Sequence, residues 1–184
     1  MNSSSFTTDI LAELSHTLGQ VSDETADQLV SAMGQANQIF VAGGGRSGFM
    51  AKAFVMRMMH MGLNAYVVGE TVTPSLEAGD LFIVGSGSGE TGSLLAMTEK
   101  AKTIGATVAA VTTNPESSIG KLGDIHITIP AQAKAEGASG KSIQPMGSLF
   151  EQSLLVLYDA LILSYMDKHQ LTSDTMYGTH ANLE

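Results

Sequence analysis

The chain has 184 residues, of which 43% are hydrophobic and 15% charged, and it contains no cysteine. These totals predict one globular domain over residues 1–184 with a sizeable core, and they exclude disulfides, thiolate catalysis and thiolate metal sites. The formal net charge is −9, with nine basic against eighteen acidic residues. Nucleic acids and anionic membranes need a basic face, so we expect neither as a partner.

No apolar stretch reaches the roughly 18 residues that span a bilayer, and the N-terminal sequence lacks the basic and apolar regions of a secretion signal. The chain is therefore expected to be soluble and cytoplasmic. The five histidines show no spacing typical of paired metal ligands, so we expect no metal, and no cofactor is expected either.

Two amphipathic helices are predicted over residues 6–19 and 22–36, because apolar side chains recur there at helical spacing. Strands and helices then alternate. The expected strands are 38–42, 64–68, 80–85, 106–112 and 124–129, and the expected helices are 47–61, 90–104, a short turn near 116–122, and 148–169. This alternation predicts an α/β fold with a parallel sheet, helices on both faces and a ligand at the carboxyl ends of the strands.

Two segments show no clear periodicity. Residues 131–146 are rich in small side chains and form the longest expected loop, which could act as a lid. The polar tail, about 171–184, is expected to be ordered through contact with a partner subunit. A run of methionines between Met50 and Met61 has helical spacing, which favours a core or a subunit interface over an adaptable binding surface.

Two glycine-rich turns, each directly after a short apolar run, are the most informative motifs. The first is Gly43-Gly-Gly-Arg-Ser-Gly48, and the second is Gly85-Ser-Gly-Ser-Gly-Glu-Thr91. Glycine lets backbone N–H groups converge, and the helix that follows adds unpaired donors and the positive end of its dipole. The two turns therefore predict a phosphorylated small molecule as substrate.

The first turn leaves two alternatives open. It matches the dinucleotide fingerprint, with Glu70 about 22 residues further on, after the next strand. The hydroxyls of Ser86, Ser88 and Thr91 in the second turn instead favour a monophosphate. Arg46 is compatible with phosphate recognition and with an ordinary loop arginine or ion pair. Neither turn is followed by Gly-Lys-Ser or Gly-Lys-Thr, which argues against nucleoside triphosphate chemistry.

Three residues are candidates for acid–base chemistry. Glu151 lies three residues after Ser148, a spacing that predicts a capping box, yet a carboxylate at this helix start is also placed to remove a carbon-bound proton. His60 and His180 are second-rank candidates: for His60 a packing or surface role is favoured over catalysis, while His180, in the tail beside an apolar residue, could be inserted into a neighbouring subunit. The segment Asn114–Ser118 follows a strand and is either a wall of the pocket or an ordinary turn before a helix.

Taken together, these motifs resemble the sugar isomerase (SIS) domain family over nearly the whole chain. The motifs that carry the resemblance are Gly43–Lys52, Arg57–Gly62, Val67–Thr71, Gly85–Thr91, Thr113–Ser118, Gln144–Glu151 and His180–Glu184. The resemblance implies a three-layer α-β-α sandwich with a five-stranded parallel sheet, and an oligomer, usually a tetramer, with pockets near subunit contacts.

The resemblance also implies roles for particular residues. Glu151 is then the catalytic base, while the sugar phosphate is bound by Ser47 and by the second turn, which comprises Ser86, Gly87, Ser88, Gly89, Glu90 and Thr91. The motifs fit members that convert a hex-3-ulose 6-phosphate into fructose 6-phosphate through a 2,3-enediolate, in the ribulose monophosphate route of formaldehyde fixation. The alternatives are an isomerase of another sugar phosphate, such as arabinose 5-phosphate, and a non-catalytic phosphosugar sensor. The family's first turn usually has alanine where this chain has Gly44.

Overall fold

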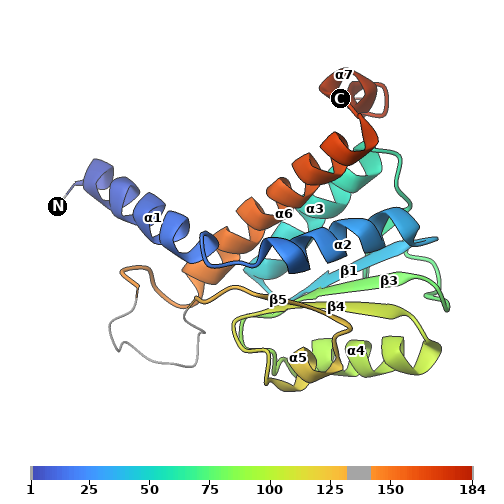
Figure 1. Ribbon diagram of the computed structural model, residues 1–184, viewed down its shortest axis with the longest axis horizontal. Coiled ribbons are helices and arrows are strands. Elements are labelled where there is room, and N and C mark those ends of the chain that lie inside the picture. Colours follow the sequence, from blue (N-terminus) through green and yellow to red (C-terminus); the bar gives the residue numbers. More distant parts are fainter. Residues whose placement is uncertain (1, 132–141, 184) are drawn as a thin grey trace.

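The computed structural model describes residues 2–131 and 142–183. Its sheet contains five parallel strands in the order β2-β1-β3-β4-β5, which confirms the expected α/β fold (Figure 1). The strands are β1 (Ile39–Gly43), β2 (Ala65–Val67), β3 (Leu81–Gly85), β4 (Thr107–Thr112) and β5 (Ile125–Thr128). Each falls within the range that the sequence predicts, apart from one residue at the end of β1.

The helices are α1 (Ser3–Leu18), α2 (Asp23–Gln35), α3 (Arg46–His60), α4 (Gly92–Ile104), α5 (Ser118–Leu122), α6 (Ser148–His169) and α7 (Ser173–Tyr177). The sequence pattern missed α7, because its five residues are mostly polar and show no apolar periodicity. Thr172 begins this helix with a capping box that it forms with Thr175.

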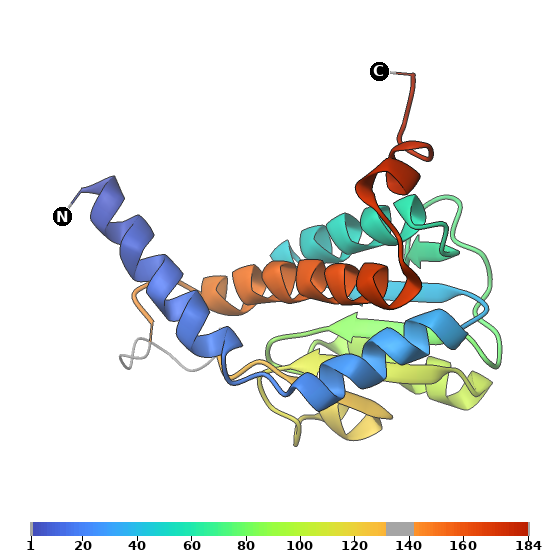
Figure 2. The ribbon, with the colours of Figure 1, turned by 45° about the horizontal axis from the view of Figure 1, so that its top comes forward.

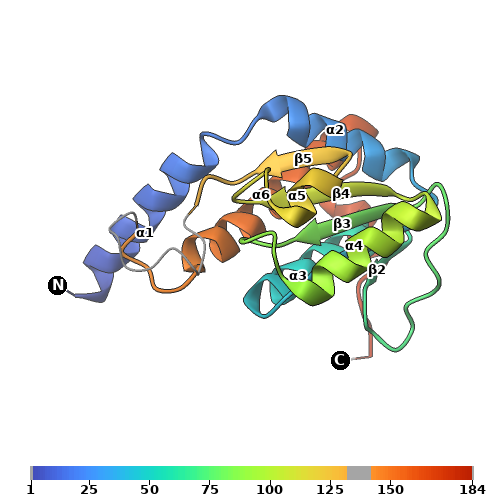
Figure 3. The same cartoon turned by 90° about the horizontal axis from the view of Figure 1, so that it is seen from below.

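Helices cover both faces of the sheet and form the three expected layers. One face packs against α2, α3 and α6, and the other against α4 and α5 (Figures 1 and 3). Side chains along each strand alternate between these layers, so that in β1 Ile39 and Val41 face the first and Phe40 and Ala42 the second. Both sets are buried, which explains why the strands are apolar on both faces.

Helix α6 is the central helix of the larger core. It is long and apolar enough to cross a membrane, with a mean hydropathy of 1.3 over 18 residues, which corrects the expectation that no segment would qualify. However, 56% of that stretch is buried inside the protein. Tyr158 of α6 stacks on Phe54 of α3 at a centroid distance of 4.2 Å. We therefore interpret α6 as the core helix of a soluble protein.

Helix α1 extends away from the sheet and contacts the rest of the protein mainly at α6 (Figure 2). Two of its large apolar side chains, Phe6 and Leu11, are exposed. Helix α1 is therefore only partly covered by the rest of the chain.

Candidate functional site

The strand order places the two glycine-rich turns side by side. From β1 the chain proceeds to β2 on one side and then returns to β3 on the other, so the order reverses between β1 and β3. Gly43 and Gly85, the last residues of these strands, are register partners. In open parallel sheets, such a reversal creates a crevice at the carboxyl ends of the strands, where ligands bind.

The first turn brings α3 very close to the end of β1. A Cβ atom on Gly48 would lie 2.7 Å from the carbonyl oxygen of Gly43, a distance that real side chains do not tolerate. The glycines here therefore allow close packing between strand and helix. Gly44 is different, because a Cβ there would meet only Leu94 and Thr91 at 3.9 and 4.0 Å. The departure from alanine at this position is not required by space.

The second turn is held by its own hydroxyls. The backbone N–H of Gly89 donates to Ser86 Oγ at 3.2 Å, and the N–H of Glu90 donates to Ser88 Oγ at 3.2 Å. Ser86 Oγ also lies 3.4 Å from Thr91 Oγ1. Gly89 has a φ of +65°, and a Cβ there would overlap the hydroxyl of Ser117, so only glycine fits.

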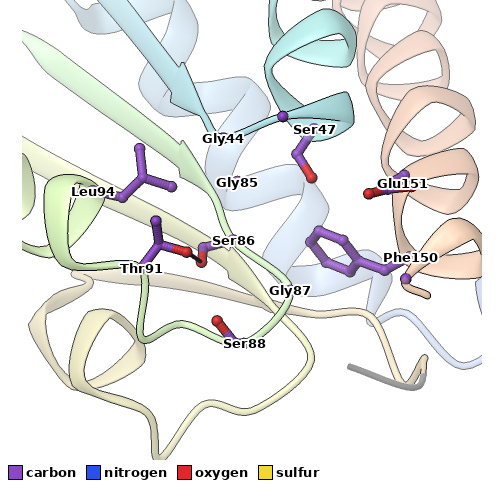
Figure 4. Close-up of a pocket in the computed structure, with 12 residues that line it drawn as sticks. Gly44, Ser47, Gly85, Ser86, Gly87, Ser88, Thr91, Leu94, Phe150 and Glu151 are labelled. Carbon is purple, nitrogen blue, oxygen red and sulfur yellow. Dashed lines mark hydrogen bonds between the residues drawn. The ribbon is translucent and has the colours of Figure 1, made fainter. Parts of the chain in front are cut away.

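A cavity of about 260 Å³ opens between the two turns and the start of α6 (Figure 4). Its volume lies just below the range of about 300–1,000 Å³ common for small-molecule pockets. Within residues 2–131 and 142–183, no group of three or more histidines and carboxylates is arranged to hold a metal ion. The lining residues are Gly44, Gly45, Ser47, Gly85, Ser86, Gly87, Ser88, Thr91, Leu94, Gly147, Phe150 and Glu151.

Three helices start at this cavity, and none of them has a side-chain cap. The N-cap residues of α3, α4 and α6 are Gly45, Thr91 and Gly147, and all three line the cavity. The first N–H groups of a helix have no partner within the helix and carry a partial positive charge. The cavity is therefore surrounded by three helix ends that favour an anion.

Glu151 faces the cavity from α6 and is 2% exposed. It lies on the same face of the helix as Leu154 and Tyr158, whose side chains pack directly under Gly85. Arg46 at the start of α3 places Nη1 3.0 Å from Glu151 Oε2 and donates a 2.8 Å hydrogen bond to Ser148 Oγ. Arg46 is thus an ion-pair partner of the candidate base, and it is not among the residues that line the cavity.

The predicted capping box at the start of α6 is not formed. Gly147, not Ser148, is the N-cap residue, and no side chain caps this helix. The N–H of Ser148 donates to the carbonyl of Pro145, and its hydroxyl accepts from Arg46. The pattern failed because Arg46, 102 residues away in sequence, is a partner that local spacing cannot reveal.

Some predicted binding residues lie outside the cavity. Ser47, Ser86, Gly87, Ser88 and Thr91 line it, but Arg46, Gly89 and Glu90 do not. Glu90 instead accepts a 2.8 Å hydrogen bond from the N–H of Ser118 at the start of α5, and this bond holds the pKa of its carboxyl below the usual value. Asn114 likewise accepts from the N–H of Glu116, so the 114–118 segment is a turn that leads into α5 and lines no part of this cavity.

His60 and His180 lie together, but they are not at this cavity. Their rings stack at a centroid distance of 5.4 Å beside Arg57, at the opposite end of α3 from Arg46. A 15-residue helix places those ends roughly 20 Å apart. Burial first, and then the nearby Arg57 and His180, lower the pKa of His60 below its ordinary value. These groups line a second pocket of about 450 Å³ with α6 and α7.

Sequence reasoning missed several lining residues. Gly147 directly precedes α6, and Phe150 lies in its first turn. Their closeness to Glu151 in the sequence is the signal that could have indicated that they line the cavity. Glu70, the acidic residue of the dinucleotide pattern, pairs with Lys52 at 2.6 Å. Most of the expected lid, residues 131–146, lies outside the described residues.

Comparisons with known proteins identify the family of this chain. The model of the SIS domain family matches residues 32–156. A Bacillus subtilis (strain 168) protein named 3-hexulose-6-phosphate isomerase is 54% identical over 185 residues, which cover all of both chains. A Mycobacterium gastri protein of the same name is 42% identical over 172 residues, 94% of this chain and 86% of that one.

Solved structures show the same arrangement. A hypothetical protein from Methanococcus jannaschii superposes with a TM-score of 0.82 at 33% identity, over 97% of this chain and 96% of that one. Its crystal structure was described as inferring a molecular function of 3-hexulose-6-phosphate isomerase. A second crystal structure, also of a hypothetical protein, superposes with a TM-score of 0.86 at 37% identity, over 95% of each chain.

Proposed function

This chain belongs to the SIS domain family, and from that premise we propose that it is a 3-hexulose-6-phosphate isomerase. It interconverts D-arabino-hex-3-ulose 6-phosphate and D-fructose 6-phosphate. The full-length identity of 54% to the Bacillus subtilis isomerase supports this activity. The observation that carries the chemistry is the position of Glu151, a buried carboxylate facing a cavity whose lining also includes four hydroxyl groups, the N-cap residues of three helices, and the apolar side chains of Leu94 and Phe150.

In this proposal the second turn binds the phosphate. Ser86, Ser88 and Thr91 supply hydroxyls, and the uncapped start of α4 supplies N–H donors and a favourable dipole. Ser47, which is 7% exposed and lies across the cavity from this turn, contacts the sugar (Figure 4). A monoester bound at the second turn would extend its carbon chain toward Glu151.

The substrate reaches the site as an open chain. In a 3-ketohexose 6-phosphate the 6-oxygen is esterified, so it cannot close a five-membered ring onto C3. No acid is needed to open a ring. Glu151 removes the proton from C2, and the released electron pair forms the C2–C3 double bond while the C3 carbonyl oxygen takes up negative charge.

The same carboxyl completes the reaction. The 2-hydroxyl loses its proton as the C2 carbonyl forms, O3 gains a proton, and the carboxyl of Glu151 returns a proton to C3. The product is fructose 6-phosphate, and the substrate undergoes no net oxidation or reduction. Charge on O2 and O3 of the enediolate is stabilised by nearby donors, for which the uncapped starts of α3 and α6 are placed. Arg46 orients the carboxylate through their 3.0 Å ion pair.

The two histidines enter this proposal only through a second subunit. His60 and His180 are far from Glu151 within one chain, so they can serve as catalytic donors only where a neighbouring copy brings its second pocket to this cavity. Exposed apolar side chains on α3 and α6 favour such association, and we propose a homo-oligomer, with a tetramer as the expected form. The exposed apolar side chains on these two helices are Phe49, Met56, Met59, Val156 and Leu163.

We further propose that the chain acts in the cytoplasm as one SIS unit over residues 1–184. The described part of the N-terminal helices and of the C-terminal tail supports this, because both pack onto the elements that form the site. Helix α1 packs against α6, and Thr179 of the tail donates a 2.8 Å hydrogen bond to the carbonyl of His60.

Isotope exchange tests the function directly. The protein is incubated with fructose 6-phosphate in deuterated water, and exchange at each carbon is followed by NMR. Deuterium at C3, together with the appearance of the 3-ketose, supports the proposal. Exchange confined to C1 would identify a 1,2-isomerase, and no exchange would indicate a phosphosugar sensor. Either of these results overturns the proposed reaction.

A further inference from the structure

One carboxylate in the N-terminal arm is bonded to the segment that precedes α6. Glu13 of α1 accepts hydrogen bonds from three consecutive residues: Ser142 Oγ at 2.9 Å, Ile143 N at 2.8 Å and Gln144 Nε2 at 3.1 Å. Both carboxylate oxygens are used. Burial acts to raise the pKa of Glu13, yet the hydrogen bonds from Ile143, Gln144 and Ser142 together lower it, as expected for bonds that favour the charged form.

The segment held by Glu13 leads directly into the candidate active site. Four residues after Gln144 comes Ser148, whose N–H donates to the carbonyl of Pro145 at 3.2 Å. Gly147, between them, lines the cavity and accepts the N–H of Glu151 at 3.0 Å. A short stretch of backbone, residues 142–147, therefore connects the groups bonded to Glu13 with the helix that carries the candidate base.

The conformation of this stretch requires support at both ends. Met146 has a φ of +62°, in the left-handed region that non-glycine residues rarely adopt, and its side chain is 71% exposed. Such a conformation persists only where the surrounding structure fixes it. The start of α6 fixes it on one side, and the three hydrogen bonds to Glu13 fix it on the other.

We propose that Glu13 is a positioning residue for the isomerase site, and that through residues 142–147 it sets the position of the first turn of α6 and hence of Glu151. The proposal rests on the proposed function for its kinetic part. It connects the position of α1 to the position of the base, although Glu13 itself is not among the residues that line the cavity.

The test compares Glu13→Ala with Asp9→Ala, a change at an exposed carboxylate one turn earlier on the same helix. Glu13→Ala is expected to lower kcat about 10- to 100-fold, the effect of a small misplacement of a catalytic group. KM should stay nearly unchanged, because the second turn is not attached to Glu13. Glu13→Gln keeps one acceptor oxygen and should recover part of kcat, while Asp9→Ala should behave as the unmodified chain.

Hydrogen–deuterium exchange supplies a second readout that does not depend on activity. In Glu13→Ala the amides of Ile143 and of residues 148–151 should exchange faster, while those of Ser86–Thr91 should not change. Unchanged exchange at 143–151 would overturn the proposal even if the chain proved not to be an isomerase. A loss of kcat equal to that of Asp9→Ala, or a rise in KM without a fall in kcat, would also overturn it.

A variant on the other side of the bonds covers the case in which Glu13→Ala does not fold. The double change Ser142→Ala with Gln144→Ala leaves α1 intact and removes two of the three hydrogen bonds. We expect the same fall in kcat in a milder form, with faster exchange at 148–151. Combined with Glu13→Gln, the effects should be less than additive, because all three side chains act in one network.

Discussion

The helices that start at the cavity differ from those that start elsewhere. Away from it, α1, α2, α5 and α7 each begin with a side-chain cap. At the cavity, α3, α4 and α6 begin without one. A glycine N-cap costs only about a few tenths of a kcal/mol relative to a side-chain cap, so the fold tolerates the glycines that begin α3 and α6. The capping residues outside the cavity are Asn2, Ser22, Ser117 and Thr172.

In the proposed function, this contrast indicates the source of the ligand's binding energy. No side chain caps these three helix starts and their N-cap residues line the cavity, so an anion that enters can take the place of the missing caps. The peripheral helix starts are stabilised by their own side chains, and in the proposed function the cavity-facing starts bind the ligand.

The largest effect is expected from the one cavity-facing start that carries a carboxylate. Glu151→Gln removes the proposed base and keeps its shape, so kcat should fall by about 10²- to 10⁴-fold or more. Binding of fructose 6-phosphate, measured by titration calorimetry, should remain, because the second turn is unchanged. Retained turnover would remove Glu151 from the chemistry and leave it a buried partner of Arg46.

A new cap at the cavity should exclude the ligand. Thr91→Asp places a strong capping carboxylate at the start of α4, where it satisfies the helix donors and repels the phosphate. KM should rise about 10- to 100-fold, equivalent to about 1.4–2.8 kcal/mol, without a loss of stability. The matched control is Ser22→Asp at the exposed start of α2, which should leave KM unaltered. Equal KM values for both variants would contradict the comparison.

Removal of a cap at a helix start away from the cavity should lower stability and leave KM unchanged, whereas a change at the cavity should alter KM. Ser22 accepts the N–H of Thr25 at 3.4 Å, a long bond, so Ser22→Ala should lower the free energy of unfolding by about 0.5–1 kcal/mol with KM unchanged. Thr91→Ala should instead raise KM and leave stability nearly constant, because Thr91 makes no cap bond. For both variants, urea unfolding measures the change in stability and steady-state kinetics measure the change in KM.

The smallest effect concerns the other end of α3. Since burial and Arg57 lower the pKa of His60, the unfolded chain binds a proton more readily than the folded one. The stabilisation that comes from keeping His60 neutral is complete at pH values above its ordinary pKa of 6.5. It is lost as the pH falls below that value. Unfolding at pH 7.5 and 5.5 should therefore show a smaller acid loss for His60→Gln than for the unmodified protein. Equal losses would show that His60 does not contribute.

The sequence predicted most of the fold because the signals for it are local. Apolar strands, helical periodicity and glycine turns depend on residues within a few positions of one another. The close approach of Gly48 to Gly43, for example, is encoded in one hexapeptide. These local signals suffice to infer that the two turns meet at one edge of the sheet.

Contacts between distant segments could not be predicted. Arg46 replaces the expected capping partner at Ser148, and Glu13 holds Ile143 across 130 positions. The family resemblance implies phosphate binding by the whole second turn, including Glu90, whereas the hydrogen bond from Ser118 to its carboxylate depends on the fold of β4 and α5. In each case the decisive partner is set by tertiary packing, for which the linear pattern holds no signal.

The site is made chiefly of uncharged donors, and this has a consequence for how substrate arrives. Backbone N–H groups and hydroxyls act at contact distance, whereas the net charge of −9 acts at long range and repels an anionic ester. Salt screens that repulsion over roughly 10 Å at 0.1 M while affecting buried contacts much less. Encounter with the ester therefore becomes faster as ionic strength rises, the reverse of what holds for enzymes that steer anions with a basic surface.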